Sequence, residues 1–253
     1  MHDEPDLRVR LRAVDRLEVQ PRQRHAHPVE SQLHQDWNSL SDKDLTLKTV
    51  FLFALASGKR RGEIHAITKG VRWIQGEFRK VELRPSADFI SKTQLACDIG
   101  KLRPFTISSL DELAGPEGKD DKLLCPVRSL RYYLQRSSEY RSEEQQKLFI
   151  SYRRGMTKDI RPMTISAYIR EAIVLAYASD PGRAVPSQIK AHSVRHVATS
   201  LQALKCFSLD DLLKAGAWST PNVFISFYLQ EFSVDSLTNL SHLGGFVAAG
   251  ARI

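Results

Sequence analysis

The sequence predicts a mainly α-helical chain with one small antiparallel β-sheet (an α+β class), and two patterns indicate it. Apolar residues recur at helical spacing in several segments between residues 45 and 243. Between about residues 71 and 107 the chain instead has short β-branched and aromatic runs, which favour strands. The length of 253 residues, 42% of them hydrophobic, suits one globular domain with or without an appendage.

Residues 1–40 lack sustained periodicity and are rich in arginine, proline and histidine. We expect a flexible basic segment there, followed by the folded domain over residues 41–253. The first helix of that domain has Ser41 or Asp44 as its cap and apolar residues at helical spacing from residue 47 to residue 55. It runs into Gly58.

Helices resume after the β-rich patch and a polar loop at residues 111–122. One begins near Cys125–Pro126, a second spans residues 164–178, and a third carries apolar positions from 194 to 204. Thr220–Pro221 then has the N-cap and first-turn proline of a further helix, which carries Tyr228. A short amphipathic helix closes the pattern with Leu237, Leu240 and Leu243.

A formal charge of +8 and a pI near 9.5 favour a polyanionic partner. No apolar run reaches the roughly 18 residues of a membrane span, and the polar N-terminus is unlike a signal peptide. The three cysteines have no paired spacing, so neither a zinc site nor a disulfide framework is expected. We expect no cofactor, no metal and a reducing compartment.

The strongest chemical pattern lies between residues 192 and 228. His192 and Arg195 are three positions apart at the start of a helix, so they share a face. The unpaired N–H groups and the dipole of a first helical turn also favour an anion. The pattern predicts a phosphate site, and Tyr228 placed beside it could attack the phosphorus.

Together with two upstream motifs, this pattern resembles the signature of the tyrosine recombinases, or phage-type integrases. Phe51–Ile64, which contains Ser-Gly-Lys-Arg-Arg-Gly-Glu-Ile, is similar to the family's first arginine motif. The segments 81–85, 89–93 and 102–107 look like the strands of its small sheet. The resemblance covers residues 45–243 and implies the DNA breaking–rejoining fold.

The resemblance also implies a role for each site residue. The catalytic set is Arg60, Lys92, His192, Arg195, Trp218 and Tyr228, with Glu63 and His196 in support. Lys101 is the alternative for the catalytic lysine. Two arginines can clamp phosphate oxygens with planar, permanently charged forks, and a lysine can protonate the leaving 5′ oxygen. The expected reaction is metal-independent cleavage and rejoining of double-stranded DNA through a 3′-phosphotyrosyl intermediate.

The arginine motif and the Trp218-to-Tyr228 spacing look most like the eukaryotic branch of DIRS-like and crypton-type mobile elements. That branch implies a nuclear location; otherwise the cytoplasm is expected. Family members carry a helical core-binding domain in front, which here is expected to be absent or truncated. The alternatives are a non-enzymatic DNA-binding remnant and a type IB topoisomerase. The last helix, from Ser233 to Leu243, either docks on a neighbouring subunit in a tetrameric synapse or packs on its own domain.

Overall fold

In the computed structural model, the described residues are 36–74, 79–92, 104–109, 123–153, 158–178, 185 and 187–204, with side chains described up to 199. They form a mainly helical α+β fold with one three-stranded antiparallel sheet, as expected. The elements in order are α2 (Asp42–Ser57), α3 (Arg61–Ala66), β1 (Arg72–Ile74), β2 (Lys80–Leu83), β3 (Phe105–Ser108), α6 (Pro126–Ser138), α7 (Pro162–Ala178) and α8 (Ser193–Leu204).

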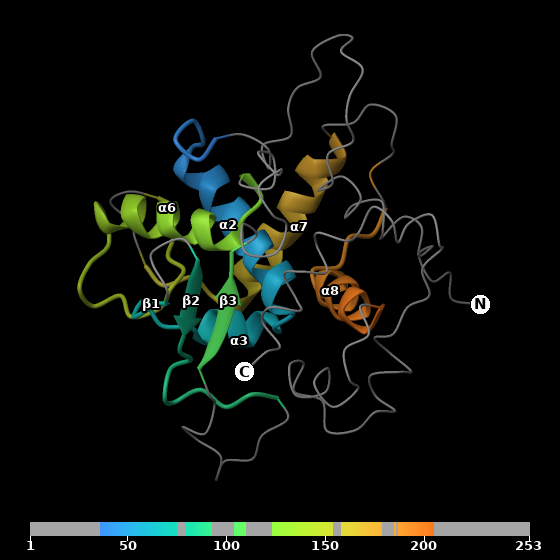
Figure 1. Ribbon diagram of the computed structural model, residues 1–253. Helices are drawn as coiled ribbons and strands as arrows, with labels where there is room; N and C mark the ends of the chain where they lie inside the picture. The colour runs from blue at the N-terminus through green and yellow to red at the C-terminus, as the bar shows by residue number, and fades with distance from the viewer. Residues whose placement is uncertain are drawn as a thin grey trace.

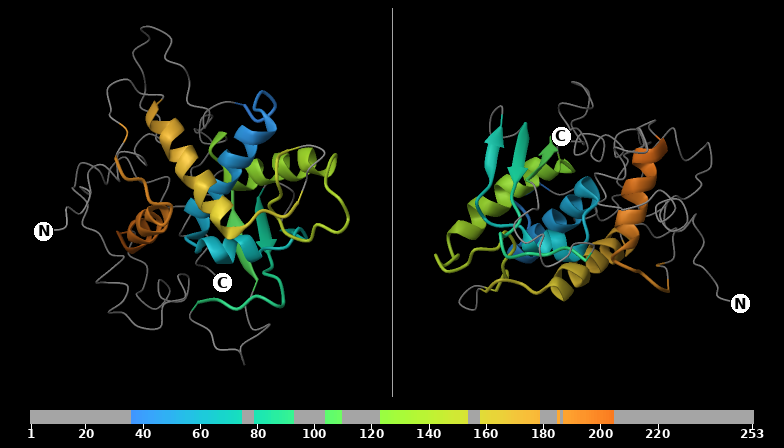
Figure 2. Two further views of the ribbon diagram at one scale, coloured as in Figure 1. Left: turned by 180° about the vertical axis from the view of Figure 1, so that it is seen from behind. Right: turned by 90° about the horizontal axis from the view of Figure 1, so that it is seen from below.

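Helix α2 is the centre of the fold. It lies between the sheet with α6 on one side and α7 with α8 on the other (Figures 1 and 2). The sequence indicated a single apolar stripe, but every residue from Leu45 to Ala56 is buried, because neighbours cover the helix all round. Its ends are as expected: Ser41 caps the first turn, and Gly58 adopts a left-handed conformation with φ 57°.

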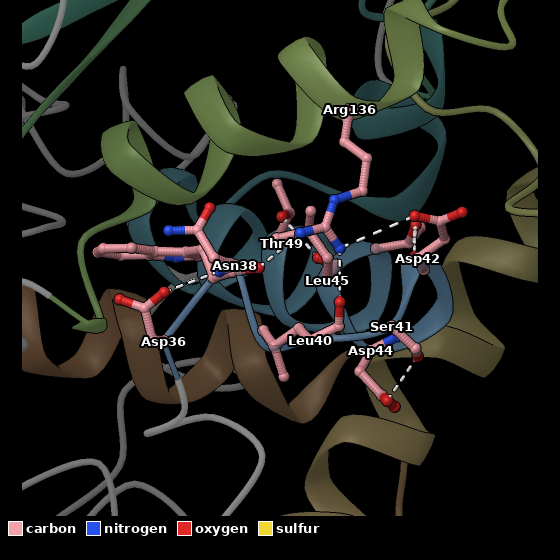
Figure 3. A network of polar contacts seen from close by, with 11 residues as sticks. Asp36, Asn38, Leu40, Ser41, Asp42, Asp44, Leu45, Thr49 and Arg136 are labelled. Atoms are coloured by element: carbon pink, nitrogen blue, oxygen red, sulfur yellow. Dashed lines mark hydrogen bonds and ion pairs between the residues drawn. The ribbon is translucent and has the colours of Figure 1, made fainter.

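The segment just before α2 is held by α6. Arg136 donates to the backbone oxygens of Trp37, at 2.8 Å, and of Leu40, and it faces Asp42 (Figure 3). The Trp37 ring stacks on Tyr132 with centroids 4.9 Å apart. Trp37 and Leu40 are both buried, so residues that the sequence assigned to the leading basic segment belong to the packed core.

The sheet has the order β1–β2–β3, with both pairings antiparallel. Val81 and Leu83 of β2 are fully buried against the helices. The β2 and β3 segments were expected, but residues 89–92 form no strand. Pro85 and a turn in which Phe89 N–H donates to Ser86 O end the strand run, because proline lacks an N–H for the ladder. The third strand of the sheet is β1, which precedes β2 in the sequence.

The other helices begin near their expected positions. Pro126 occupies the first turn of α6, α7 starts two residues before the expected Thr164, and α8 starts at Ser193. Phe53 of α2 meets Phe105 of β3 and Phe149 edge to face, which joins the central helix to the sheet. In the described part of the chain, no helix is long and apolar enough to cross a membrane.

Candidate anion-binding site

The site begins at the short turn between α2 and α3. Gly58 ends α2 in a left-handed conformation, and its N–H donates to Ala54 O. Arg60 then stands at the N-cap of α3, where the Glu63 carboxylate turns back to it. Glu63 Oε2 accepts the Arg60 backbone N–H at 2.7 Å, and Oε1 accepts from Arg60 Nη1 at 3.1 Å. The Gly58 turn and this carboxylate therefore fix the position of Arg60.

Arg195, 135 positions later in the chain, comes to the same carboxylate. Its Nη1 lies 3.7 Å from Glu63 Oε2. Its side chain is only 4% exposed and that of Glu63 is 10% exposed, whereas that of Arg60 is 22% exposed. A charged side chain that is as buried as Arg195 needs an ionic partner. Glu63 is thus the junction that holds two guanidinium groups together, with Arg60 on the more open side.

Packing between α2 and α8 sets the position of Arg195. A Cβ added at Gly58 would lie 3.5 Å from Cγ2 of Thr199, so the end of α2 directly abuts α8. One turn before Thr199 is Arg195, whose carbonyl accepts the Thr199 hydroxyl at 2.8 Å. Val194 and Val197 are buried beside it. The apolar side of α8 therefore carries Arg195 into the protein toward Glu63.

Arg61 points elsewhere. Its Nη1 lies 3.3 Å from Met163 Sδ and 3.5 Å from Ser166 Oγ, both on α7. The two adjacent arginines thus separate: Arg60 faces the Glu63 junction and Arg61 faces α7. The structure therefore gives the two adjacent arginines different contacts, and the assignment of Arg60 as the catalytic one stays a prediction.

His192 and His196 lie at the start of α8. The His192 carbonyl accepts the backbone N–H groups of Arg195 and His196, and its side chain is exposed. The two imidazole rings are 5.3 Å apart. The structure therefore places an exposed His192 and a partly buried His196 on the same helical turn as the buried Arg195.

Lys92 is exposed and lies in a turn, not on a strand. Phe89, three residues earlier, lies beside Gly62 of α3: a Cβ added there would be 3.8 Å from the Phe89 ring. The assignment of Lys92 as the catalytic lysine remains a prediction. Lys101, Trp218, Tyr228 and the helices expected after residue 204 lie outside the described residues.

Lys59 is a charged residue of this region to which the sequence reading gave no role. It is partly buried, and its ammonium lies 5.0 Å from the centre of the Phe105 ring. Burial lowers its pKa; Glu63 opposes that shift, and the charges of Arg195 and Arg60 add to it. The signal available in the sequence is the place of Lys59 between Gly58 and Arg60 in the arginine motif.

Within the described ranges, no three histidine, cysteine or acidic side chains form a group that could hold a metal ion. The described site is therefore a set of cations around one carboxylate. Such a set can bind an anion with oxygen atoms, since guanidinium N–H groups form short, charge-assisted hydrogen bonds to them.

Comparison with known proteins gives a likeness to solved structures. No family model and no curated protein matches the chain. Among solved structures, the crystal structure of XerA recombinase superposes with a TM-score of 0.47 and 15% sequence identity, over 87% of this chain. The match covers 65% of the XerA chain.

Proposed function

We propose that this chain cleaves and rejoins double-stranded DNA as a tyrosine recombinase. The observation that carries the proposal is the meeting of Arg60 and Arg195 at Glu63. The two arginines come from separate motifs, 135 positions apart, which the sequence resemblance had paired as the phosphate clamp. Folding brings together the two residues that this chemistry requires to be together.

The proposed reaction begins when the Tyr228 oxygen attacks the scissile phosphorus. A new Tyr–O–P bond forms as the P–O5′ bond breaks, and the departing 5′ oxygen receives a proton from Lys92, the proposed general acid. Arg60 and Arg195 stabilise the charge on the non-bridging oxygens. In this proposal His192, which is exposed at the head of α8, accepts the tyrosine proton. The phosphotyrosyl bond keeps the phosphodiester energy, so rejoining reverses the step without ATP.

Glu63 acts in this proposal as a positioning residue. A carboxylate at the Arg60 N–H and beside two guanidinium groups fixes their forks before DNA arrives. Preorganised charge is effective because the groups need not reorient during the reaction. The partial exposure of Arg60 leaves a route by which a large, charged substrate can reach the pair.

A suicide DNA substrate, nicked close to the cleavage point, tests the proposal. The short cleaved strand diffuses away, so the covalent protein–DNA adduct accumulates and is seen by denaturing gel electrophoresis. Wild-type protein is expected to form the adduct and Tyr228→Phe to form none. Equal adduct from both proteins would refute the role of Tyr228. DNA binding with no adduct from either would favour a non-enzymatic DNA-binding protein.

The sequence resemblance carries three finer parts of the proposal. They are membership of the eukaryotic mobile-element branch, a nuclear location and self-association on DNA through residues 233–243. The last is tested by deleting the chain from Ser233 onward. We expect a soluble monomer that binds DNA but forms neither synapse nor adduct efficiently. An unfolded deletion variant would mean that the segment packs on its own domain.

A further inference from the structure

The residues on both sides of Lys59 have a fixed backbone, which places Lys59 next to the arginine pair. It follows Gly58, whose left-handed backbone turns the chain out of α2 and against α8. It precedes Arg60, whose backbone is fixed by Glu63. Its ammonium lies over the Phe105 ring of β3, 5.0 Å from the ring centre. The position is therefore set by three elements, α2, α3 and β3.

The charged groups described around Lys59 come from α3, from the head of α8 and from the turn between α2 and α3. Glu63 is the acidic member, and Arg60 and Arg195 are the basic members whose charges act on Lys59. His192 and His196 flank Arg195 at the head of α8. In this described group, one carboxylate lies among three basic side chains, whose N–H groups are donors for the oxygen atoms of an anion.

We propose that Lys59 is a third phosphate-binding cation of this site, acting together with Arg60 and Arg195. This inference rests on the proposed function, because it adds a residue to the same phosphate clamp. Lysine supplies a compact point charge on a mobile stem, whereas the arginines supply fixed forks. The aromatic face of Phe105 holds the ammonium near the site until an anion arrives.

The position also couples anion binding to a proton. Burial and the two arginines lower the pKa of Lys59 in the free protein. A bound anion favours the charged ammonium and therefore raises that pKa. Above the free-state pKa, anion binding must draw a proton from solvent to Lys59, so the affinity falls as pH rises through this range. Below the free-state pKa, Lys59 is charged in both states and contributes no pH dependence.

The test measures sulfate binding to the full chain by isothermal titration calorimetry from about pH 7 to about pH 10, the upper range of lysine titration. Sulfate keeps the same charge throughout, so the probe adds no titration of its own. Lys59→Met should bind roughly tenfold or more weakly near neutral pH, since one charged hydrogen bond is lost. Lys59→Arg should keep the affinity but lose the pH dependence, because arginine stays protonated.

Two controls locate the effect. Lys43→Met removes the same charge at the far end of α2, where Lys43 pairs with Glu171 on the surface, and should bind sulfate as wild type does. Arg60→Gln should weaken binding, which shows that the sulfate occupies this site. Circular dichroism establishes that each variant is folded; if Lys59→Arg is not, the flattened pH profile of Lys59→Met decides.

The inference would be overturned if folded Lys59→Met bound sulfate as tightly as wild type. It would also be overturned if the sulfate affinity of the Lys59 variants kept the pH dependence of wild type. The absence of any sulfate binding that depends on Arg60 would overturn it as well. These outcomes are separate from the adduct assay, which uses DNA and Tyr228→Phe. A Lys59-dependent sulfate site without DNA adduct would refute the cleavage proposal but leave an anion site in place.

Discussion

Replacing Lys48 by methionine should change how the stability of the fold depends on pH. Lys48 lies on the buried central helix α2, with 1% of its surface exposed, and its ammonium is 5.1 Å from the centre of the Trp37 ring. Burial lowers its pKa from 10.5 to about 7, an effect that the charge of Asp36 partly offsets. Methionine keeps most of the apolar stem and removes the titrating group.

The sign follows from proton binding. Between about pH 7 and pH 10.5, the unfolded chain holds a proton on Lys48 that the folded chain has lost, so the free energy of unfolding rises with pH. Below about pH 7 the lysine is charged in both states, and its contribution is constant. The full difference corresponds to roughly 5 kcal/mol at about 1.36 kcal/mol per pH unit. From pH 7 to pH 9 the rise is about 2 kcal/mol.

Urea unfolding followed by circular dichroism at pH 7 and pH 9 measures this difference. From pH 7 to pH 9, the free energy of unfolding should rise by about 2 kcal/mol more in wild type than in Lys48→Met. Lys43→Met is the matched control on the same helix: Lys43 is exposed and bound to Glu171, which raises its pKa, so it stays charged over this range. Parallel pH profiles of wild type and Lys48→Met would refute the reasoning.

Three further predictions concern the site. Arg60→Lys should reduce adduct formation by roughly 10²–10³-fold, because lysine lacks the fork that binds the phosphate. Arg61 faces α7, so Arg61→Lys should form adduct as wild type does. The reverse result would place the motif one residue out of register. Glu63→Gln should destabilise the fold by about 1–3 kcal/mol in thermal unfolding, through the loss of charge-assisted hydrogen bonds to Arg60 and of the ion pair with the buried Arg195. No change in melting temperature would mean that the carboxylate does not hold the pair. Gly58→Ala should cost about 1–2 kcal/mol in urea unfolding because its φ is 57°, and an unchanged midpoint would contradict this.

Local chemistry sufficed to predict much of the fold from the sequence. Ser41 was one of two expected caps of α2, Gly58 was expected to end it, and Pro126 was expected in the first turn of α6. These features depend on residues within one turn of each other, so they can be read without knowing the tertiary contacts. The strand expected at residues 89–93 was wrong over its described part, residues 89–92, because the turn beginning at Ser86 and the packing of Phe89 beside Gly62 are not visible in a local strand pattern.

The sequence by itself also determined the chemical types of the site: two arginines in separate motifs, with Glu63 three residues after the first. Only the tertiary structure decided that one carboxylate contacts both arginines, that Arg61 turns away to α7, and that Lys59 lies beside the pair over Phe105. It likewise decided that Lys48 is buried. The physical reason is that a side chain's charge environment is set by elements distant in sequence, which meet only when α2, α8 and the sheet pack together.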